Sequence, residues 1–210
     1  MLEKLSYSLG RRDEEPDIEL AVELTETKNR RGIKEIVEGL GDKREQIAND
    51  CIKVLYEIGY REPSLISDHA GVFLSLLTSR NNRLVWGAMT ALSTIASINP
   101  EMIFDKLDLV IKAYEKGSVI TVDSSISVFA GLVSSGDKYA KKVWPVIIKH
   151  LETCRPKEVA QHAERAFVCV NEKNAGVFKK TLEKRLYSLS EPQLKRVNKL
   201  LKKIDGKKFG

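Results

Sequence analysis

Four apolar segments with the same pattern recur along the chain at a nearly constant spacing. They begin at residues 46, 83, 120 and 158, so each starts 37 or 38 residues after the one before it. Small or apolar residues occupy positions 0, +3, +4 and +7 counted from Cys51, Ala88, Ser125 and Ala163. This is the spacing of one face of an α-helix and not of a strand. One such face cannot stay buried alone, so each copy needs a neighbour. The segments are QIANDCIKVLYEIG (46–59), RLVWGAMTALSTIA (83–96), ITVDSSISVFAGLV (120–133) and EVAQHAERAFVCVN (158–171).

A second helical pattern precedes each apolar segment, and a short polar turn separates the two. Asp42, Asn82 and Ser118 stand in these turns and are predicted to be N-caps of the helices that follow. The repeating unit is therefore helix, tight turn, helix. A fifth, degenerate unit follows at 174–205, and a short helix over 16–26 is expected to cover the first unit. The preceding helices are predicted at 33–41, 64–79, 100–117 and 138–154.

These two-helix units resemble the HEAT-repeat family, in its PBS-lyase-like or armadillo-type form. The resemblance rests on Asp42 or Asn82 at the turn and on the Ala, Leu and Ile face behind it. Two departures stand out: Trp86 occupies a position that is basic in many such repeats, and no ladder of Asp–Arg pairs is visible. The resemblance implies an all-α fold, a right-handed α-α superhelix (HEAT-like solenoid) of about five helix pairs.

The predicted solenoid is one continuous domain over residues 16–205. Residues 1–15 and 206–210 are assigned to terminal tails, and the sequence leaves open whether the first tail is ordered. The units are expected at about 30–60, 63–99, 100–136, 137–172 and 174–205.

Positive charge is concentrated near the end of the chain. Residues 179–210 contain 11 Lys and Arg against 3 Asp and Glu, a net charge of +8. The whole chain carries +6, so residues 1–178 sum to −2. Such a segment can attract nucleic acid phosphates or an acidic partner. The simpler interpretation is a lysine-rich solvent face on a capping helix. The residues of this basic tip are Lys195, Arg196, Lys199, Lys202 and Lys203.

The second helices of HEAT-type solenoids usually line the concave face, which makes their exposed positions candidates for partner contacts. Trp86 stands where the other copies carry polar residues, and an exposed tryptophan is a natural anchor. A purely structural packing role for Trp86 fits the sequence equally well. The candidate groove contacts are Trp86, Asp123, Arg165 and Tyr56.

No catalytic signature is found in the sequence. There is no phosphate-binding loop, no HExxH motif and no zinc-type cysteine spacing, so neither a catalytic residue, a cofactor nor a metal is predicted. The three histidines, His69, His150 and His162, are assigned to different repeats as surface or packing residues. The cysteines are interpreted as buried free thiols of a cytoplasmic protein, since no signal-peptide core or membrane span is recognised.

The predicted function is a non-catalytic scaffold or adaptor that presents a concave helical surface to a protein partner. The alternative is a DNA-binding protein or a relative of the HEAT-like alkylpurine DNA glycosylases. Such glycosylases hold a catalytic carboxylate near aromatic residues, and Asp123 near Trp86, with Arg165 further on, matches them in residue type only. A third interpretation is a structural subunit of a larger complex. The partner and the oligomeric state are not predicted.

Overall fold

The computed structural model describes residues 1–206, which form helices and connecting segments with no β-strand among them. The chain divides into two compact units, Met1–Val128 and Phe129–Gly210, where the sequence predicts one continuous domain. The division falls within helix α8 (Val119–Ser134). Beyond Gly206, the predicted C-terminal tail lies outside the described residues. Within residues 1–206, no helix combines the length and apolar character needed to cross a bilayer.

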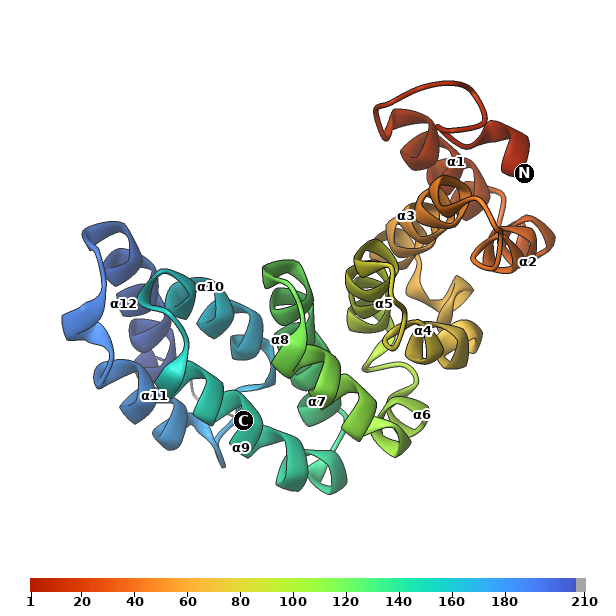
Figure 1. Cartoon of the computed structure of the whole chain (residues 1–210). Helices are drawn as coiled ribbons and strands as arrows, with labels where there is room; N and C mark the ends of the chain where they lie inside the picture. Colours follow the sequence, from red (N-terminus) through yellow and green to blue (C-terminus); the bar gives the residue numbers. More distant parts are fainter. Residues whose placement is uncertain (207–210) are drawn as a thin grey trace. The chain divides into compact units, whose positions relative to one another are not determined.

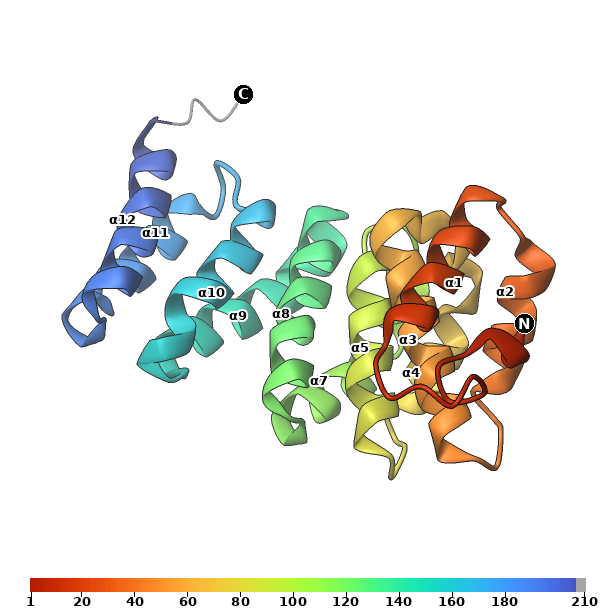
Figure 2. The same ribbon diagram turned by 90° about the horizontal axis from the view of Figure 1, so that it is seen from above.

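In the first unit, helix α3 packs between α1 and α5, and these three helices lie side by side in both views (Figures 1 and 2). Helix α2 contacts α3, and α4 contacts α5, so the first two predicted helix pairs form. The helices are α1 (Glu15–Glu26), α2 (Arg30–Gly39), α3 (Glu45–Arg61), α4 (Ala70–Leu76), α5 (Asn82–Ile95), α6 (Pro100–Asp105), α7 (Leu107–Lys116) and the first part of α8.

The second unit contains two further helix pairs. Helix α9 packs on α11, and α10 packs on α12, so that the corresponding helices of successive pairs stack on each other. This stacking is the arrangement expected of helical repeats. The helices that follow α8 are α9 (Asp137–Thr153), α10 (Pro156–Ala166), α11 (Ala175–Glu183) and α12 (Glu191–Gly206) (Figure 1).

The repeated apolar face is buried in the first three segments, which confirms their helical interpretation. In the fourth segment the α-helix ends at Ala166 and a 3-10 turn follows at Phe167–Cys169, so the predicted helix is shorter there. In α3 and α5 the four positions of this face have no exposed surface. Burying one large aliphatic or aromatic side chain contributes about 1.5–3 kcal/mol, so the repeated face is a main source of stability. The fully buried members are Cys51, Val54, Leu55, Ile58, Ala88, Ala91, Leu92, Ile95, Ser125, Val128, Phe129, Leu132, Ala163 and Ala166.

Small residues let α3 and α5 approach closely. A Cβ atom added at Gly87 of α5 would lie 2.7 Å from Cγ1 of Ile52 on α3, which is far inside van der Waals contact. The apolar face of α5 therefore requires glycine at this position for the observed packing.

The helix starts differ from the sequence prediction at two of the three turns. The cap of α5 is Asn81, not Asn82: the Asn81 side chain accepts a hydrogen bond from the backbone N–H of Arg83 at 2.9 Å. Asp42 lies two residues before the N-cap position of α3 and accepts from the backbone N–H of Arg44 at 2.8 Å. The N-cap position of Ser118 is confirmed, because α8 begins at the next residue. The Ser118 hydroxyl accepts a hydrogen bond from the backbone N–H of Thr121 at 3.4 Å.

The first 14 residues pack against helices α1 and α3 of the same unit. Leu5 is fully buried, and the backbone N–H of Ser6 donates to the carboxylate of Asp17 on α1 at 3.0 Å. The backbone N–H of Tyr7 donates to Asp50 on α3 at 2.8 Å. This segment thus covers surfaces of α1 and α3 that would otherwise face solvent, as a capping element does in a repeat protein.

Candidate binding site

Two of the predicted groove residues, Tyr56 on α3 and Trp86 on α5, lie in contact. Their ring centroids are 5.8 Å apart and the ring planes are tilted by 47°. The guanidinium of Arg83 lies 5.4 Å from the Trp86 ring, and Tyr56 is only 7% exposed. Trp86 is therefore half-buried between a phenol ring and a guanidinium, which leaves part of the indole accessible.

A chain of ion pairs runs beside these rings. Nζ of Lys53 lies 3.1 Å from a carboxylate oxygen of Glu14 and 2.8 Å from one of Glu57. Arg83 pairs with Glu14, and Arg61 pairs with Glu57 at 2.6 Å. Burial opposes the charge of Lys53, but hydrogen bonds to both glutamates outweigh it and raise the pKa of Lys53 above its ordinary value. The charges on this surface therefore largely neutralise one another.

The other two predicted groove residues lie on different helices and in different units. Asp123 is half-buried on α8 within the first unit, and Arg165 is half-buried on α10 in the second. Of the four candidates, the structure thus brings together Tyr56 and Trp86. A role for the four residues in partner binding stays a prediction.

The basic tip lies on α12 with all five of its residues exposed. Acidic residues already neutralise part of it. Arg196 donates to both carboxylate oxygens of Glu164 on α10, at 2.9 and 2.6 Å, and holds the pKa of Glu164 below its usual range. Lys195 pairs with Glu191 at 2.8 Å. The tip thus offers less free charge than its composition suggests.

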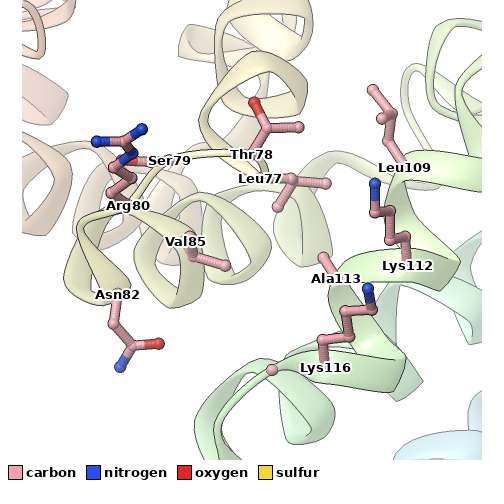
Figure 3. Close-up of a pocket in the computed structure, with 11 residues that line it drawn as sticks. Leu77, Thr78, Ser79, Arg80, Asn82, Val85, Leu109, Lys112, Ala113 and Lys116 are labelled. Carbon is pink, nitrogen blue, oxygen red and sulfur yellow. The ribbon is translucent and has the colours of Figure 1, made fainter.

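A groove with a cavity of about 330 Å³ lies between the turn that precedes α5 and helix α7 (Figure 3). We call it the α5–α7 groove. In Figure 3, Leu77, Val85 and Ala113 lie between Arg80 on one side and two lysines of α7 on the other. The lining residues are Leu77, Thr78, Ser79, Arg80, Asn82, Val85, Leu109, Lys112, Ala113, Lys116 and Gly117.

The α5–α7 groove carries three cations and no acidic lining residue. Arg80, Lys112 and Lys116 are exposed, and within residues 1–206 none of the three makes a side-chain hydrogen bond or an ion pair. Sequence reasoning missed this site. The spacing of Lys112 and Lys116, one turn apart on a helix, was the available signal, but nothing local indicated that Arg80 lines the same groove.

A second, more apolar hollow of about 290 Å³ adjoins this groove and shares Leu109 with it. It lies between α4 and the helices α6 and α7, and Met102, one of its lining residues, is 41% exposed. Its other lining residues are Gly71, Leu74, Ser75, Asp105 and Lys106. Leu109 therefore connects a cationic hollow with an apolar one along the same side of α7.

The assignment of His150 and His162 to different repeats is wrong. They lie on α9 and α10 of one helix pair, where Nε2 of His150 is 2.7 Å from Nδ1 of His162. Both rings are buried, and the thiol of Cys154 lies close to them, so that one donor atom of each residue falls within 4.8 Å of the others. Burial raises the pKa of the Cys154 thiol above its ordinary value. The tight turn between α9 and α10 brings the three side chains together.

Comparison with known proteins identifies the fold. No protein-family model and no curated protein sequence matches the chain. An engineered protein of known structure superposes with a TM-score of 0.65 at 20% identity, over 97% of this chain and 96% of its own. A designed armadillo repeat protein in complex with the peptide (KR)4 superposes with a TM-score of 0.67 at 15% identity, over 88% of this chain and 85% of its own.

A further designed armadillo repeat protein matches with a TM-score of 0.68 at 14% identity, over 97% of this chain and all of its own (100%). Structural similarity at sequence identities of 14–20% shows the fold alone. The chain is an all-α helical solenoid of the HEAT/armadillo type, as its repeated helical face predicts.

Proposed function

We propose that the protein is a non-catalytic scaffold that binds a segment of another protein, and that the segment bound in the α5–α7 groove is acidic. The observation that carries this proposal is the set of cations around the groove. Arg80, Lys112 and Lys116 are exposed and make no ion pair within residues 1–206, whereas Lys53, Arg61 and Arg83 on the neighbouring helices are paired.

The chemistry of the groove favours a segment in which acidic and apolar residues are close together. An apolar side chain of the partner packs on Leu77, Val85 and Ala113, which line the cavity between the cations. Carboxylates on either side of that side chain then pair with the guanidinium and the ammonium groups. Because these cations are exposed before binding, pairing them does not first require breaking an internal salt bridge.

The helical-repeat architecture supports the same proposal. Stacked helices form a rigid surface, and a rigid surface lowers the entropy lost when an extended segment binds. One structurally similar protein is a designed armadillo repeat protein in complex with (KR)4, a basic peptide. The α5–α7 groove carries the same sign of charge as that peptide, so we infer that its partner has the opposite sign.

The test is the binding of fluorescently labelled peptides, measured by anisotropy at low and moderate salt. The probes are (EL)4, its charge-reversed counterpart (KL)4, and a DNA duplex. We expect the wild type to bind (EL)4 in preference to (KL)4, with an affinity that falls as salt rises. An Arg80→Gln/Lys112→Gln/Lys116→Gln variant should bind (EL)4 at least about 10-fold more weakly, a change of about 1.4 kcal/mol.

A variant that removes the same amount of charge elsewhere is the matched control. Lys199→Gln/Lys202→Gln/Lys203→Gln alters α12 and leaves the groove intact. If this control loses (EL)4 binding while the groove variant keeps it, the proposal is overturned in favour of the basic tip. Tight, salt-dependent binding of DNA that exceeds binding of (EL)4 would instead favour the nucleic-acid alternative.

A further inference from the structure

The second unit contains a cluster of three nitrogen and sulfur ligands outside the groove described above. His150 lies in the last turn of α9, Cys154 follows that helix directly, and His162 lies in α10. One donor atom from each lies within 4.8 Å of the other two. We propose that these three residues bind one Zn²⁺ ion, which links the end of α9 to α10.

The local backbone sets this arrangement. The backbone N–H of Cys154 donates to the carbonyl of His150 at 2.8 Å, so the two residues lie one helical turn apart with their side chains on the same side. The turn at Arg155 then reverses the chain into α10, which begins at Pro156. His162 is placed opposite His150, with the two rings 4.7 Å apart between centroids.

The three donor atoms lie near enough together for one tetrahedral zinc ion to bind them after small side-chain shifts, since each pair is within 4.8 Å. Zn–N bonds of about 2.0–2.1 Å and a Zn–S bond of about 2.3 Å place such donors about 3.3–3.7 Å apart. The histidine nitrogens, at 2.7 Å, lie slightly closer than this, because they share a hydrogen bond. A zinc ion replaces that hydrogen bond when the donating ring moves its proton to the far nitrogen and the thiol of Cys154 releases its proton to solvent.

The surroundings favour a transition-metal cation over other ions. Two imidazoles and a thiolate are the borderline and soft ligands that zinc prefers, whereas Mg²⁺ and Ca²⁺ require oxygen ligands. The carbonyl end of α9 carries partial negative charge, which stabilises a cation there. His150 is 6% exposed and His162 is fully buried, so packing already holds the two rings in place.

Arg185 supports the backbone of the site. Its guanidinium donates to the carbonyls of Leu151 and Cys154, each at 2.7 Å, and so fixes the last turn of α9 and the residue that follows it. Cys154 itself is half-buried, so it is the most exposed of the three residues. Three protein ligands leave a fourth position that a water molecule fills.

The experiment is a titration of the untagged, EDTA-treated full chain with Co²⁺ and then Zn²⁺, followed by absorption. We expect a thiolate-to-cobalt charge-transfer band and tetrahedral d–d bands that saturate at one Co²⁺ per chain and disappear when Zn²⁺ is added. Cys154→Ser should abolish the charge-transfer band, and His162→Gln should weaken binding at least about 100-fold. Zn²⁺ should raise the Tm of the wild type but not of these variants.

The matched control is His69→Gln, which removes a histidine from the first unit and should leave the titration unchanged. Circular dichroism checks that each variant is folded. If His162→Gln is unfolded, Cys154→Ser decides the question, because a half-buried thiol tolerates replacement by a hydroxyl better. A wild type that shows no charge-transfer band, or a band that persists in Cys154→Ser, would overturn the proposal and leave the cluster as a buried histidine pair.

Discussion

Nζ of Lys53 lies 2.8 Å from Oε1 of Glu57, one turn further along α3, and the lysine side chain is only 8% exposed. A charge held so far from water requires its partners, and Glu14 supplies the second carboxylate at 3.1 Å. Because Glu14 precedes α1 whereas Lys53 lies on α3, this ion pair fastens the N-terminal segment to the second helix of the first predicted unit.

Lys53→Met should therefore destabilise the first unit. The substitution leaves Glu57 and Glu14 without their shared cation, and we expect a loss of about 2–4 kcal/mol at pH 7. Pairing holds the pKa values of Glu14 and Glu57 below their ordinary range, so their stabilising contribution is lost as the pH falls through those lowered values. The difference between wild type and Lys53→Met, measured by urea unfolding, should shrink towards pH 3; a constant difference would contradict this account.

At Asp17 we expect stability to depend on pH in the opposite direction to that expected for Glu14 and Glu57. Burial raises its pKa from 3.8 to about 6, and only one of its carboxylate oxygens has a hydrogen-bond partner among the described residues. A carboxyl group with a raised folded-state pKa stabilises the fold below its unfolded pKa, and this contribution is lost as the pH rises through about 6.

Asp17→Asn should accordingly be more stable than the wild type at pH 7, by about 1–3 kcal/mol, and should match it at pH 3.5. The amide oxygen can still accept from the backbone N–H of Ser6. Asp108→Asn, at an exposed site on α7, is the control and should leave the pH dependence unchanged. Chemical unfolding at several pH values measures both, and equal pH profiles for wild type and Asp17→Asn would disprove the assignment.

Two glycine substitutions test the close packing of α3 and α5. Gly87→Ala adds a Cβ that would meet Ile52 at 2.7 Å, so we expect a loss of about 1–3 kcal/mol. Gly176→Ala, in α11, meets nothing within 4 Å and should stabilise its helix by about 0.5–1 kcal/mol. Thermal unfolding of the two variants should show Tm shifts of opposite sign, and equal shifts would mean that α3 and α5 can separate at little cost.

Arg185→Met should destabilise the second unit. The guanidinium satisfies two backbone carbonyls at the end of α9, and leaving them without donors costs about 1–3 kcal/mol. Lys184→Met removes the same charge from the neighbouring exposed position and should have little effect. Hydrogen exchange at the end of α9 would report the local change, and unaltered protection there in Arg185→Met would argue against this capping role.

Most of the fold could be predicted because the repeated face is a local pattern. The helix α5 was expected at 83–96 and is observed at Asn82–Ile95, and the fully buried Ala88 and Leu92 follow from their spacing alone. The end caps were harder, since neighbouring Asn81 and Asn82 are equally good caps by composition. Which one adopts the non-helical geometry depends on how the turn packs.

The candidate sites were much less accessible to sequence reasoning. Tyr56 and Trp86 were both singled out, but their mutual contact and the low exposure of Tyr56 come from the approach of α3 and α5. His150 and Cys154 stand one turn apart in the sequence, which is a visible signal for a shared site. The third donor, His162, lies on the next helix, and its distance depends on the angle of the turn at Arg155.

The sequence by itself determined that this protein is a stack of paired helices, because a helical hydrophobic face repeated every 37 or 38 residues can be buried only against its own neighbours. Only the tertiary structure decided which charges are neutralised and which remain free. Lys53 forms ion pairs, whereas Lys112 and Lys116 border a groove without one among the described residues. All three are lysines within predicted helices, so their residue type does not distinguish them. The physical reason is that periodicity is a property of neighbouring residues, whereas ion pairs, grooves and ligand clusters depend on distances between helices.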